Sequence, residues 1–97
     1  MDKKIILDYL AKNKEIFKEK YGVTKIGLFG SYVRNEQRDD SDIDIAVEMI
    51  EEKKTLRTFF GFKQEIEMAF GKKVDLGIES TLKPIAKEYI LKEIIYV

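Results

Sequence analysis

Residues 29–47 read FGSYVRNEQRDDSDIDIAV, a Gly-Ser pair followed by a polar loop and then by aspartates that alternate with isoleucines. Successive side chains of a β-strand point to opposite faces of a sheet. The alternation therefore predicts a strand over 42–48, in which Asp42 and Asp44 share one face and the isoleucines share the other. Two carboxylates on one face of an otherwise apolar strand are costly unless something compensates their charge, so this segment is the first candidate for a functional site.

The rest of the chain predicts an α/β fold of the α+β type, with a small mixed sheet flanked by helices in the order αβαβαβα. Helices are indicated by apolar residues three and four positions apart, and strands by short runs of branched residues. In chain order the expected elements are a helix over 2–20, a strand over 23–29, a short helix over 31–34, the strand over 42–48, a helix over 55–70, a strand over 72–78, and a last helix that ends near Leu91, with residues 94–97 as its tail or as a short strand. No repeat or linker interrupts this pattern, which predicts a single domain over 1–97.

Composition limits the chemistry that the chain can perform. It contains neither Cys nor His, which excludes disulfides, thiolate catalysis and zinc sites built on those residues. A general base must then be Asp, Glu, Lys or Tyr, and a metal site must consist of oxygen ligands, which suit magnesium, manganese or calcium. The 18 basic residues are balanced by 18 acidic ones, and this neutrality argues against direct binding of nucleic acid.

The N-terminal segment does not resemble a signal peptide, because its apolar run, Ile5–Leu7, is too short. No segment has the length of a membrane span. These two features predict a cytoplasmic protein that does not contact a membrane.

A third carboxylate, Asp75, interrupts the apolar run of the strand expected over 72–78. If this strand lies beside the one over 42–48, Asp75 joins Asp42 and Asp44 on the same face. Three carboxylates would then offer oxygen ligands to one or two magnesium ions, and two such ions are a standard device for nucleotidyl transfer. Two alternatives remain open: Asp42 and Asp44 could form the exposed face of an edge strand, and Asp75 could be an ion-pair partner.

The residues before these carboxylates predict a phosphate site. Gly30 allows the backbone to approach a ligand, and Ser31 opens the expected short helix, whose free N–H groups attract anions. Arg34 follows one helical turn later and can add a forked ionic contact. Each residue also has a non-functional interpretation, as a turn, a helix cap or a solvated side chain. A purely structural role for the whole segment requires all of these interpretations, and those of the carboxylates, to be true at the same time.

An EF-hand calcium loop is a competing interpretation of the same aspartates. Asp40, Asp42, Asp44 and Glu51 fall at positions 1, 3, 5 and 12 of such a loop. Its sixth position requires glycine for a sharp turn, and here that position is Ile45, inside the predicted strand. Calcium binding of this kind is therefore rejected.

The residues GSYVRN…DDSDIDIAVE resemble the signature of polymerase-β-type nucleotidyltransferases, and KKVDLG is similar to the strand that carries their third carboxylate. The size of the chain and its end, LKPIAKEYILKEIIYV, resemble the minimal nucleotidyltransferases, which are antitoxin partners of HEPN-domain toxins. The resemblance implies a mixed-sheet fold, two magnesium ions (or manganese) and a nucleoside triphosphate, ATP. It also implies that Gly30, Ser31 and Arg34 hold the triphosphate, that Asp42 and Asp44 bind both metals, and that Asp75 binds one metal and helps to deprotonate the acceptor. The family usually has glycine after the arginine, whereas this chain has Asn35.

The function that this resemblance implies is transfer of AMP from ATP to a hydroxyl group, a tyrosine in particular, of a HEPN-type toxin, in a type VII-like toxin–antitoxin pair. An alternative is a binding module of the same fold that neutralises its partner by covering it. A third is nucleotidyl transfer to RNA, which the neutral charge disfavours, or to a small molecule, which the missing acceptor domain disfavours.

The aromatic run TFFGF, residues 58–62, predicts a contact surface. Phe59, Phe60 and Phe62 cannot all face one narrow stripe of a helix. We therefore expect Phe60 or Phe62 to be partly exposed and to contact a partner or a second copy of the chain. The alternative is that a thin domain buries all three.

Overall fold

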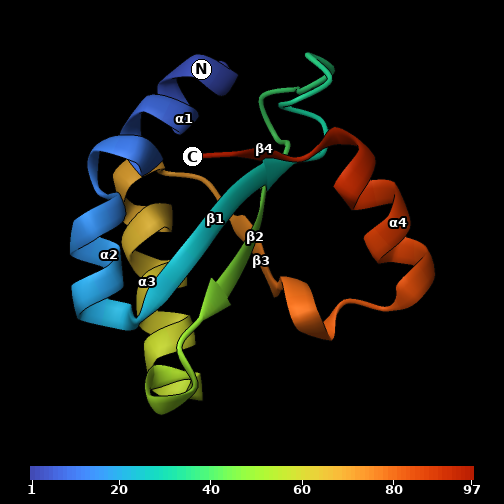
Figure 1. The fold of residues 1–97 in the computed structure, drawn as a ribbon. Helices are drawn as coiled ribbons and strands as arrows, with labels where there is room; N and C mark the ends of the chain where they lie inside the picture. The colour runs from blue at the N-terminus through green and yellow to red at the C-terminus, as the bar shows by residue number, and fades with distance from the viewer.

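The computed structural model describes residues 1–97, which form one four-stranded sheet covered by helices (Figure 1). The strands are β1 (Val23–Phe29), β2 (Ile43–Met49), β3 (Val74–Ile78) and β4 (Ile95–Tyr96), and they lie in the order β3-β2-β1-β4. β1 is antiparallel to β2 and to β4, whereas β2 and β3 are parallel. The predicted mixed sheet is confirmed.

The helices are α1 (Lys3–Lys12), α2 (Lys14–Tyr21), α3 (Leu56–Phe70) and α4 (Pro84–Glu93), with single 3-10 turns at Glu51–Lys53 and Glu79–Thr81. Figure 1 shows α2 and α3 side by side on one side of the sheet, with α1 above them and α4 on the other side. Glycines in the left-handed conformation end α2 and α3, as is usual for helix C-termini.

The expected single helix over 2–20 is wrong, because the chain breaks it at Asn13. The side-chain amide of Asn13 donates to the Tyr9 carbonyl oxygen at 2.9 Å, and its backbone N–H donates to the same atom at 3.1 Å. Asparagine competes with helical hydrogen bonding in this way, so the residue closes α1 and α2 begins after it. Asp2 caps the N-terminus of α1, because its side chain accepts a bond from the Ile5 N–H, 3.2 Å long.

One further expectation is wrong near the sheet, because residues 31–34 form a hydrogen-bonded turn and not a helix. Of the two alternatives for residues 94–97, the short strand is confirmed, as β4. The turn does not continue as a helix because Asn35 adopts a left-handed backbone conformation, with φ at 58°. β1 and β2 are thus consecutive in the observed order of elements, without a helix between them.

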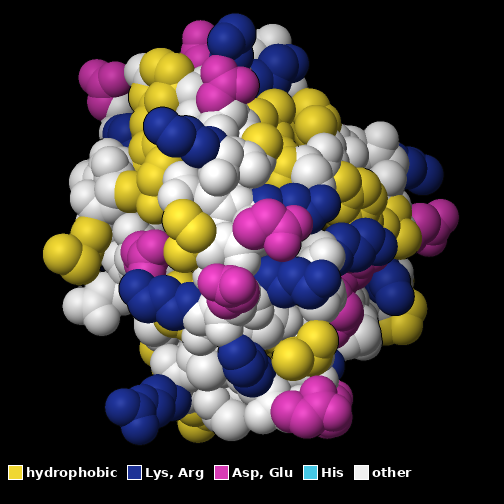
Figure 2. Space-filling model, turned by 60° about the vertical axis from the view of Figure 1, so that its left-hand side comes forward, with side chains coloured by type: hydrophobic (Ala, Val, Ile, Leu, Met, Phe, Trp, Pro, Cys, Tyr) yellow, Lys and Arg dark blue, Asp and Glu magenta, His cyan; other side chains and the backbone are white.

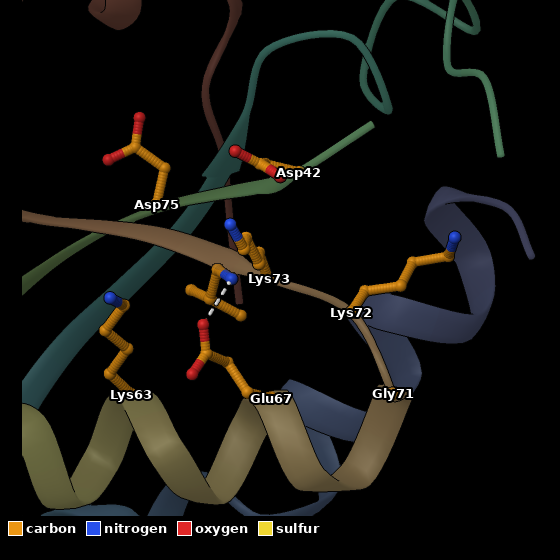
Figure 3. A pocket seen from close by; sticks show the side chains of 8 residues that line it. Asp42, Lys63, Glu67, Gly71, Lys72, Lys73 and Asp75 are labelled. Carbon is orange, nitrogen blue, oxygen red and sulfur yellow. Dashed lines mark hydrogen bonds between the residues drawn. The ribbon is translucent and has the colours of Figure 1, made fainter. Parts of the chain in front are cut away.

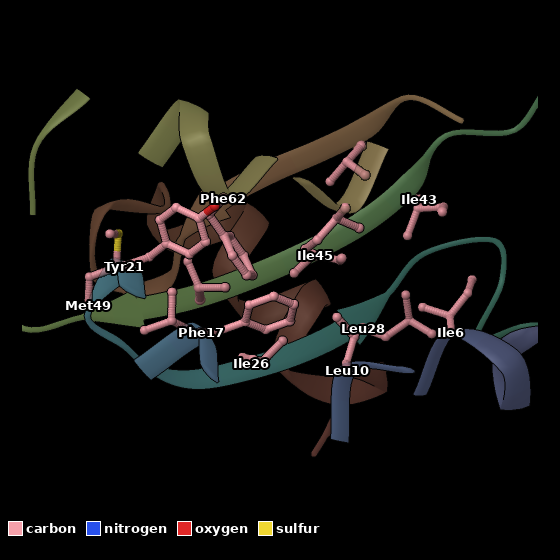
Figure 4. Packing of buried hydrophobic residues seen from close by; sticks show 14 of the residues in the cluster. Ile6, Leu10, Phe17, Tyr21, Ile26, Leu28, Ile43, Ile45, Met49 and Phe62 are labelled. Atoms are coloured by element: carbon pink, nitrogen blue, oxygen red, sulfur yellow. The ribbon is translucent and has the colours of Figure 1, made fainter. Parts of the chain in front are cut away.

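The hydrophobic core lies between the sheet and the helices α1, α2 and α3 (Figure 4). Phe17 and Phe62 are fully buried and meet edge to face, with ring centroids 4.9 Å apart. The isoleucines of β2, Ile43 and Ile45, are fully buried on this side, as the alternation predicted. α4 contributes no buried residue.

Basic and acidic side chains are mixed on the surface. Figure 2 shows basic and acidic side chains interspersed over one face, with apolar side chains between them. Phe60 is 54% exposed whereas Phe62 is buried, so the expectation that one of them reaches the surface is confirmed. None of the helices combines the length and the apolar character that crossing a membrane requires.

Candidate active site

The parallel pairing of β2 with β3 brings two of the predicted carboxylates to the same level of the sheet. Asp44 is the register partner of Asp75, and Asp42 lies just before the first residue of β2. Asp42 and Asp75 are exposed, and Asp44 is partly buried between the neighbouring strands. In Figure 3 the side chains of Asp42 and Asp75 project from the same side of these strands.

Asp44 has the most perturbed environment of the three. Burial, as the largest cause, and the nearby charges of Asp75 and Asp42 together raise the pKa of this carboxyl to about 6. Arg34 partly opposes this effect. A partly buried carboxyl group whose pKa is raised by two neighbouring carboxylates is typical of sites that bind cations or transfer protons.

Gly30 is required by Asp44 itself. The residue has φ at 83°, and a Cβ atom built on it would lie 2.0 Å from Oδ2 of Asp44. The glycine was expected to admit a ligand, but the structure shows that its first role is to leave room for the carboxylate of the neighbouring strand. β1 and β2 place the two residues together, since Phe29 is the register partner of Asp44.

The turn over 30–35 is held by its own backbone. The N–H groups of Val33 and Arg34 donate to the Gly30 carbonyl oxygen at 3.1 and 3.2 Å, and the Glu36 N–H donates to that of Ser31 at 2.9 Å. Ser31 is partly exposed at the start of this turn. Asn35 takes the left-handed conformation that the family's usual glycine would take, since asparagine is among the residues that tolerate it.

Sequence reasoning missed Glu93, the last residue of α4. Its carboxylate accepts two bonds from Nη1 of Arg34, 2.8 and 3.0 Å long, and a third from the Gly30 N–H, 3.2 Å long. Arg34 also donates from Nε to Glu36 at 2.7 Å. Two of the groups predicted to hold phosphate therefore hold a carboxylate in this structure. Their spacing along the sequence carries no signal for this, because Glu93 lies 59 residues beyond Arg34.

The donor set fits a hard divalent cation, although the side chains are not gathered around one point. Asp42, Asp44 and Asp75 offer only oxygen ligands, and a cation would relieve the repulsion that raises the pKa of Asp44. No group of three acidic side chains lies close enough together in this structure to hold a metal ion. Binding would thus require the exposed side chains of Asp42 and Asp75 to turn toward Asp44.

A hollow of about 680 Å³ adjoins these carboxylates on the outer side of β3 (Figure 3). It lies between β3 and the C-terminal half of α3, and its lining includes Lys63, Lys72 and Lys73 beside Asp42 and Asp75. Only one of its eight lining residues is hydrophobic. Sequence reasoning did not single out these lysines, because Lys63 belongs to a different element and only the fold brings it to the others.

Comparison with known proteins points to one family. A family model described as a nucleotidyltransferase domain matches residues 10–97. A protein of Methanocaldococcus jannaschii with the provisional name protein adenylyltransferase is 47% identical over 93 residues, which cover 95% of this chain and 94% of that protein. The protein adenylyltransferase MntA of Thermococcus cleftensis is 41% identical over 88 residues, which cover 91% of this chain and 88% of that one.

Several solved structures share the fold of this chain. One, provisionally described as a minimal nucleotidyltransferase, has a TM-score of 0.74 at 33% identity and covers 98% of this chain and 95% of its own. A toxin–antitoxin complex with AMP-PNP has a TM-score of 0.71 at 22% identity, covering 88% of this chain and 69% of the matched one. A complex of tri-AMPylated Shewanella oneidensis HEPN toxin with MNT antitoxin has a TM-score of 0.69 at 20% identity, covering 96% and 69%. At identities this low, the two complexes share the fold alone.

Proposed function

This chain belongs to the nucleotidyltransferase domain family, and we propose that it transfers AMP from ATP to a hydroxyl group, a tyrosine in particular, of a HEPN-domain toxin. It would act as the antitoxin of a type VII-like pair. The observation that carries this proposal is the position of Asp44, which lies between Asp75 on β3 and the Cβ-free Gly30 on the turn after β1. This arrangement places a pair of carboxylates beside a turn that can bind phosphate.

The chain's own groups would hold the triphosphate at this turn. The Gly30 N–H and the Ser31 hydroxyl can donate to phosphate oxygens, and Arg34 can form an ionic contact. Glu93 supports this assignment indirectly, because the Gly30 N–H and Arg34 already bind an anionic group in its carboxylate. The triphosphate would replace that carboxylate.

The three carboxylates would hold two magnesium ions, or manganese, with Asp42 and Asp44 contacting both and Asp75 one. When bound, these ions would supply charge neutralisation for the carboxylates and for the triphosphate. Asp75 lies on the exposed edge strand, where an acceptor hydroxyl can reach it, and would accept the proton of that hydroxyl.

The transfer forms one bond and breaks one. The acceptor oxygen attacks the α-phosphorus of ATP in line, the bond from that phosphorus to the β-bridging oxygen breaks, and pyrophosphate leaves. With no His or Cys in the chain, only a carboxylate, a lysine or a tyrosine can take part in proton transfer.

A protein partner is supported by the names of the relatives and by the surface of this chain. The relatives are named protein adenylyltransferases, and a HEPN toxin accompanies the MNT antitoxin in one of the similar structures. On this chain Ile85 and Tyr89 of α4 are 74% and 70% exposed, and Phe60 is exposed on α3. Such exposed apolar side chains favour docking of a protein over binding of nucleic acid. A second copy of the chain is the other candidate for contact with them.

The test takes a HEPN-domain partner, to be sought in the gene beside that of this chain, and measures its intact mass after incubation with the chain, ATP and magnesium. We expect one or more added AMP groups. Asp42→Asn should abolish the addition, because it removes a ligand for both metals. Asp40→Asn is the matched control, since this exposed loop carboxylate lies two residues away and has no assigned role.

The alternative, a non-catalytic antitoxin that neutralises its partner by forming a complex, is favoured by the same exposed apolar side chains. A stable complex without a change in mass, and neutralisation that survives Asp42→Asn, would establish it and exclude the transfer. Transfer of AMP to RNA or to a small molecule but not to the partner would contradict both.

A further inference from the structure

The strand β3, which carries Asp75, has an unpaired outer edge, because it is the last strand on its side of the sheet. Its five residues, VDLGI, include neither proline nor lysine. Proteins often block an open edge with such residues or cover it, since the unpaired main-chain groups of an edge bind other strands. Leu76, Gly77 and Ile78 are partly exposed here. This edge is therefore a candidate for binding a further strand.

The backbone groups of β3 point alternately toward β2 and toward the outer edge. The Lys73 carbonyl oxygen, just before the strand, accepts a bond from β2 at 2.9 Å. The next N–H, that of Val74, points the other way and donates to Glu67 at 2.9 Å, the bond drawn in Figure 3. The same alternation turns the N–H groups of Leu76 and Ile78 outward, where no loop carbonyl accepts from them. Two main-chain donors are thus free at the edge.

A pocket of about 430 Å³ lies beside this edge, between β3 and the N-terminal half of α3. Its hydrophobic lining consists of Leu56 and Phe59 from α3 and Leu76 and Ile78 from β3. Phe59 belongs to the TFFGF run and meets Phe60 edge to face, with ring centroids 5.3 Å apart. The volume and the partly apolar lining suit an apolar side chain.

Asp75 lies on the opposite face of the same strand, and in Figure 3 its side chain projects away from α3. A strand bound to the edge would run about 4.8 Å from β3, with side chains that alternate between the two faces of the sheet. A hydroxyl-bearing side chain on the face of Asp75 lies within reach of that carboxylate. The next residue along then faces the pocket. The free donors, the carboxylate and the pocket are therefore arranged for an extended polypeptide.

We propose that the outer edge of β3 binds the protein acceptor as an added strand, through main-chain hydrogen bonds to Leu76 and Ile78. This inference rests on the proposed function and specifies its substrate. The acceptor is an extended segment with an apolar residue one or three positions away from the residue that receives AMP. In recognition of this kind the main-chain bonds supply affinity and the pocket for an alternate side chain supplies specificity.

Residue-resolved amide hydrogen exchange tests the added strand. It is measured by NMR on the chain alone and on its complex with the HEPN-domain partner, with magnesium and α,β-methylene ATP, from which AMP cannot be transferred. The N–H groups of Leu76 and Ile78 should exchange quickly in the free chain and at least about tenfold more slowly in the complex. The Val74 N–H is the internal control, because Glu67 already accepts its bond and its exchange should change little.

The variant Leu56→Gln tests the pocket. Leu56 and Met68 are both 76% exposed on α3, but only Leu56 lines the pocket, so Met68→Gln is the matched control. We expect Leu56→Gln to lower kcat/KM for the partner about fivefold, because an apolar contact is lost, and to leave the KM for ATP unchanged. The control should change neither value. Thermal unfolding of both variants should match the wild type, since substitutions at exposed positions have small effects on stability.

The outcomes separate this inference from the proposed function. If the wild-type chain adds no AMP to the partner from ATP, the proposed function fails, whatever the exchange rates are. If AMP is added but the Leu76 and Ile78 amides exchange as quickly in the complex as in the free chain, the added strand alone is refuted. Equal effects of Leu56→Gln and Met68→Gln refute the pocket, and so does a rise in the KM for ATP equal to that for the partner, which would assign the pocket to the nucleotide.

Discussion

At the scale of single residues, Gly30 and Asp44 are the pair on which the site depends. Both were chosen from the sequence as functional residues, but the reason for the glycine was incomplete. Its missing side chain serves the carboxylate of β2 at least as much as it serves a ligand. This is a tertiary relation between two strands, and the Gly-Ser pair looks the same in the sequence whether or not such a neighbour exists.

Gly30→Ala should remove the activity, because a Cβ atom would occupy the position of Asp44 Oδ2. We expect the rate of AMP transfer to fall at least about 100-fold, since displacement of a catalytic group by about 1 Å has effects of this size. Steady-state transfer to the partner measures this loss.

Gly71→Ala is the matched control for Gly30→Ala. Gly71 also has a positive φ, of 64°, but a Cβ atom there would meet nothing within 4 Å. Gly71→Ala should cost about 1 kcal/mol of stability through backbone strain and leave the transfer of AMP largely intact. Equal losses of activity in the two variants would mean that backbone strain, and not contact with Asp44, explains the effect of Gly30→Ala.

At the scale of elements, α4 is held to the site mainly through its last residue. None of its side chains is buried, and Glu93 joins it to the turn through Arg34 and Gly30. Sequence periodicity identified the helix but could not show this attachment, because the hydrophobic pattern of α4 does not describe a buried face. The same helix presents Ile85 and Tyr89 to solvent, so it connects the turn over 30–35 with the side chains proposed to contact the partner.

Glu93→Gln should strengthen ATP binding, because a neutral amide competes less well than a carboxylate for Arg34 and the Gly30 N–H. We expect the Kd for ATP to fall about threefold to tenfold, measured by calorimetry with magnesium present. Glu88→Gln is the control, since it removes an exposed carboxylate from the same helix. Weaker ATP binding by Glu93→Gln would instead mean that Glu93 supports the shape of the turn.

At the scale of the whole molecule, the charge of Asp44 lowers the free energy of unfolding of the metal-free protein at neutral pH. The raised pKa of Asp44 means that the folded state binds a proton more tightly than the unfolded state does. The contribution of Asp44 to stability is therefore fully present below its unfolded pKa, near 3.8, and is lost as the pH rises through its folded pKa of about 6. Allowing for the partial exposure of the side chain, this loss is about 1 to 2 kcal/mol.

Asp44→Asn should accordingly stabilise the metal-free protein by about 1 to 2 kcal/mol at pH 7.5 and by almost nothing at pH 4, while it abolishes transfer. Urea unfolding at the two pH values measures the difference. Magnesium should raise the stability of the wild type more than that of the variant, because the variant lacks a ligand. A variant that is less stable at pH 7.5 would show that Arg34 already compensates the Asp44 charge.

The sequence was sufficient for the parts of this molecule that depend on local patterns. The alternation of Asp and Ile predicted both the strand and its buried face. The break at Asn13, the Glu93 contacts and the hollow lined by Lys63, Lys72 and Lys73 were missed, and the sequence did not decide between a helix tail and a strand for residues 94–97. Each depends on a competing hydrogen bond or on residues far apart in the chain, which periodicity does not register.

The attachment of Glu93 also bears on how the molecule assembles. Its bonds to Gly30 and Arg34 span 63 and 59 residues, and β4 pairs with β1 over a similar separation. Closing so large a loop is entropically costly and slows folding. During synthesis on the ribosome, β1 and the turn over 30–35 emerge long before α4 does. The groups proposed to bind phosphate are therefore synthesised well before the carboxylate that binds them in the folded chain.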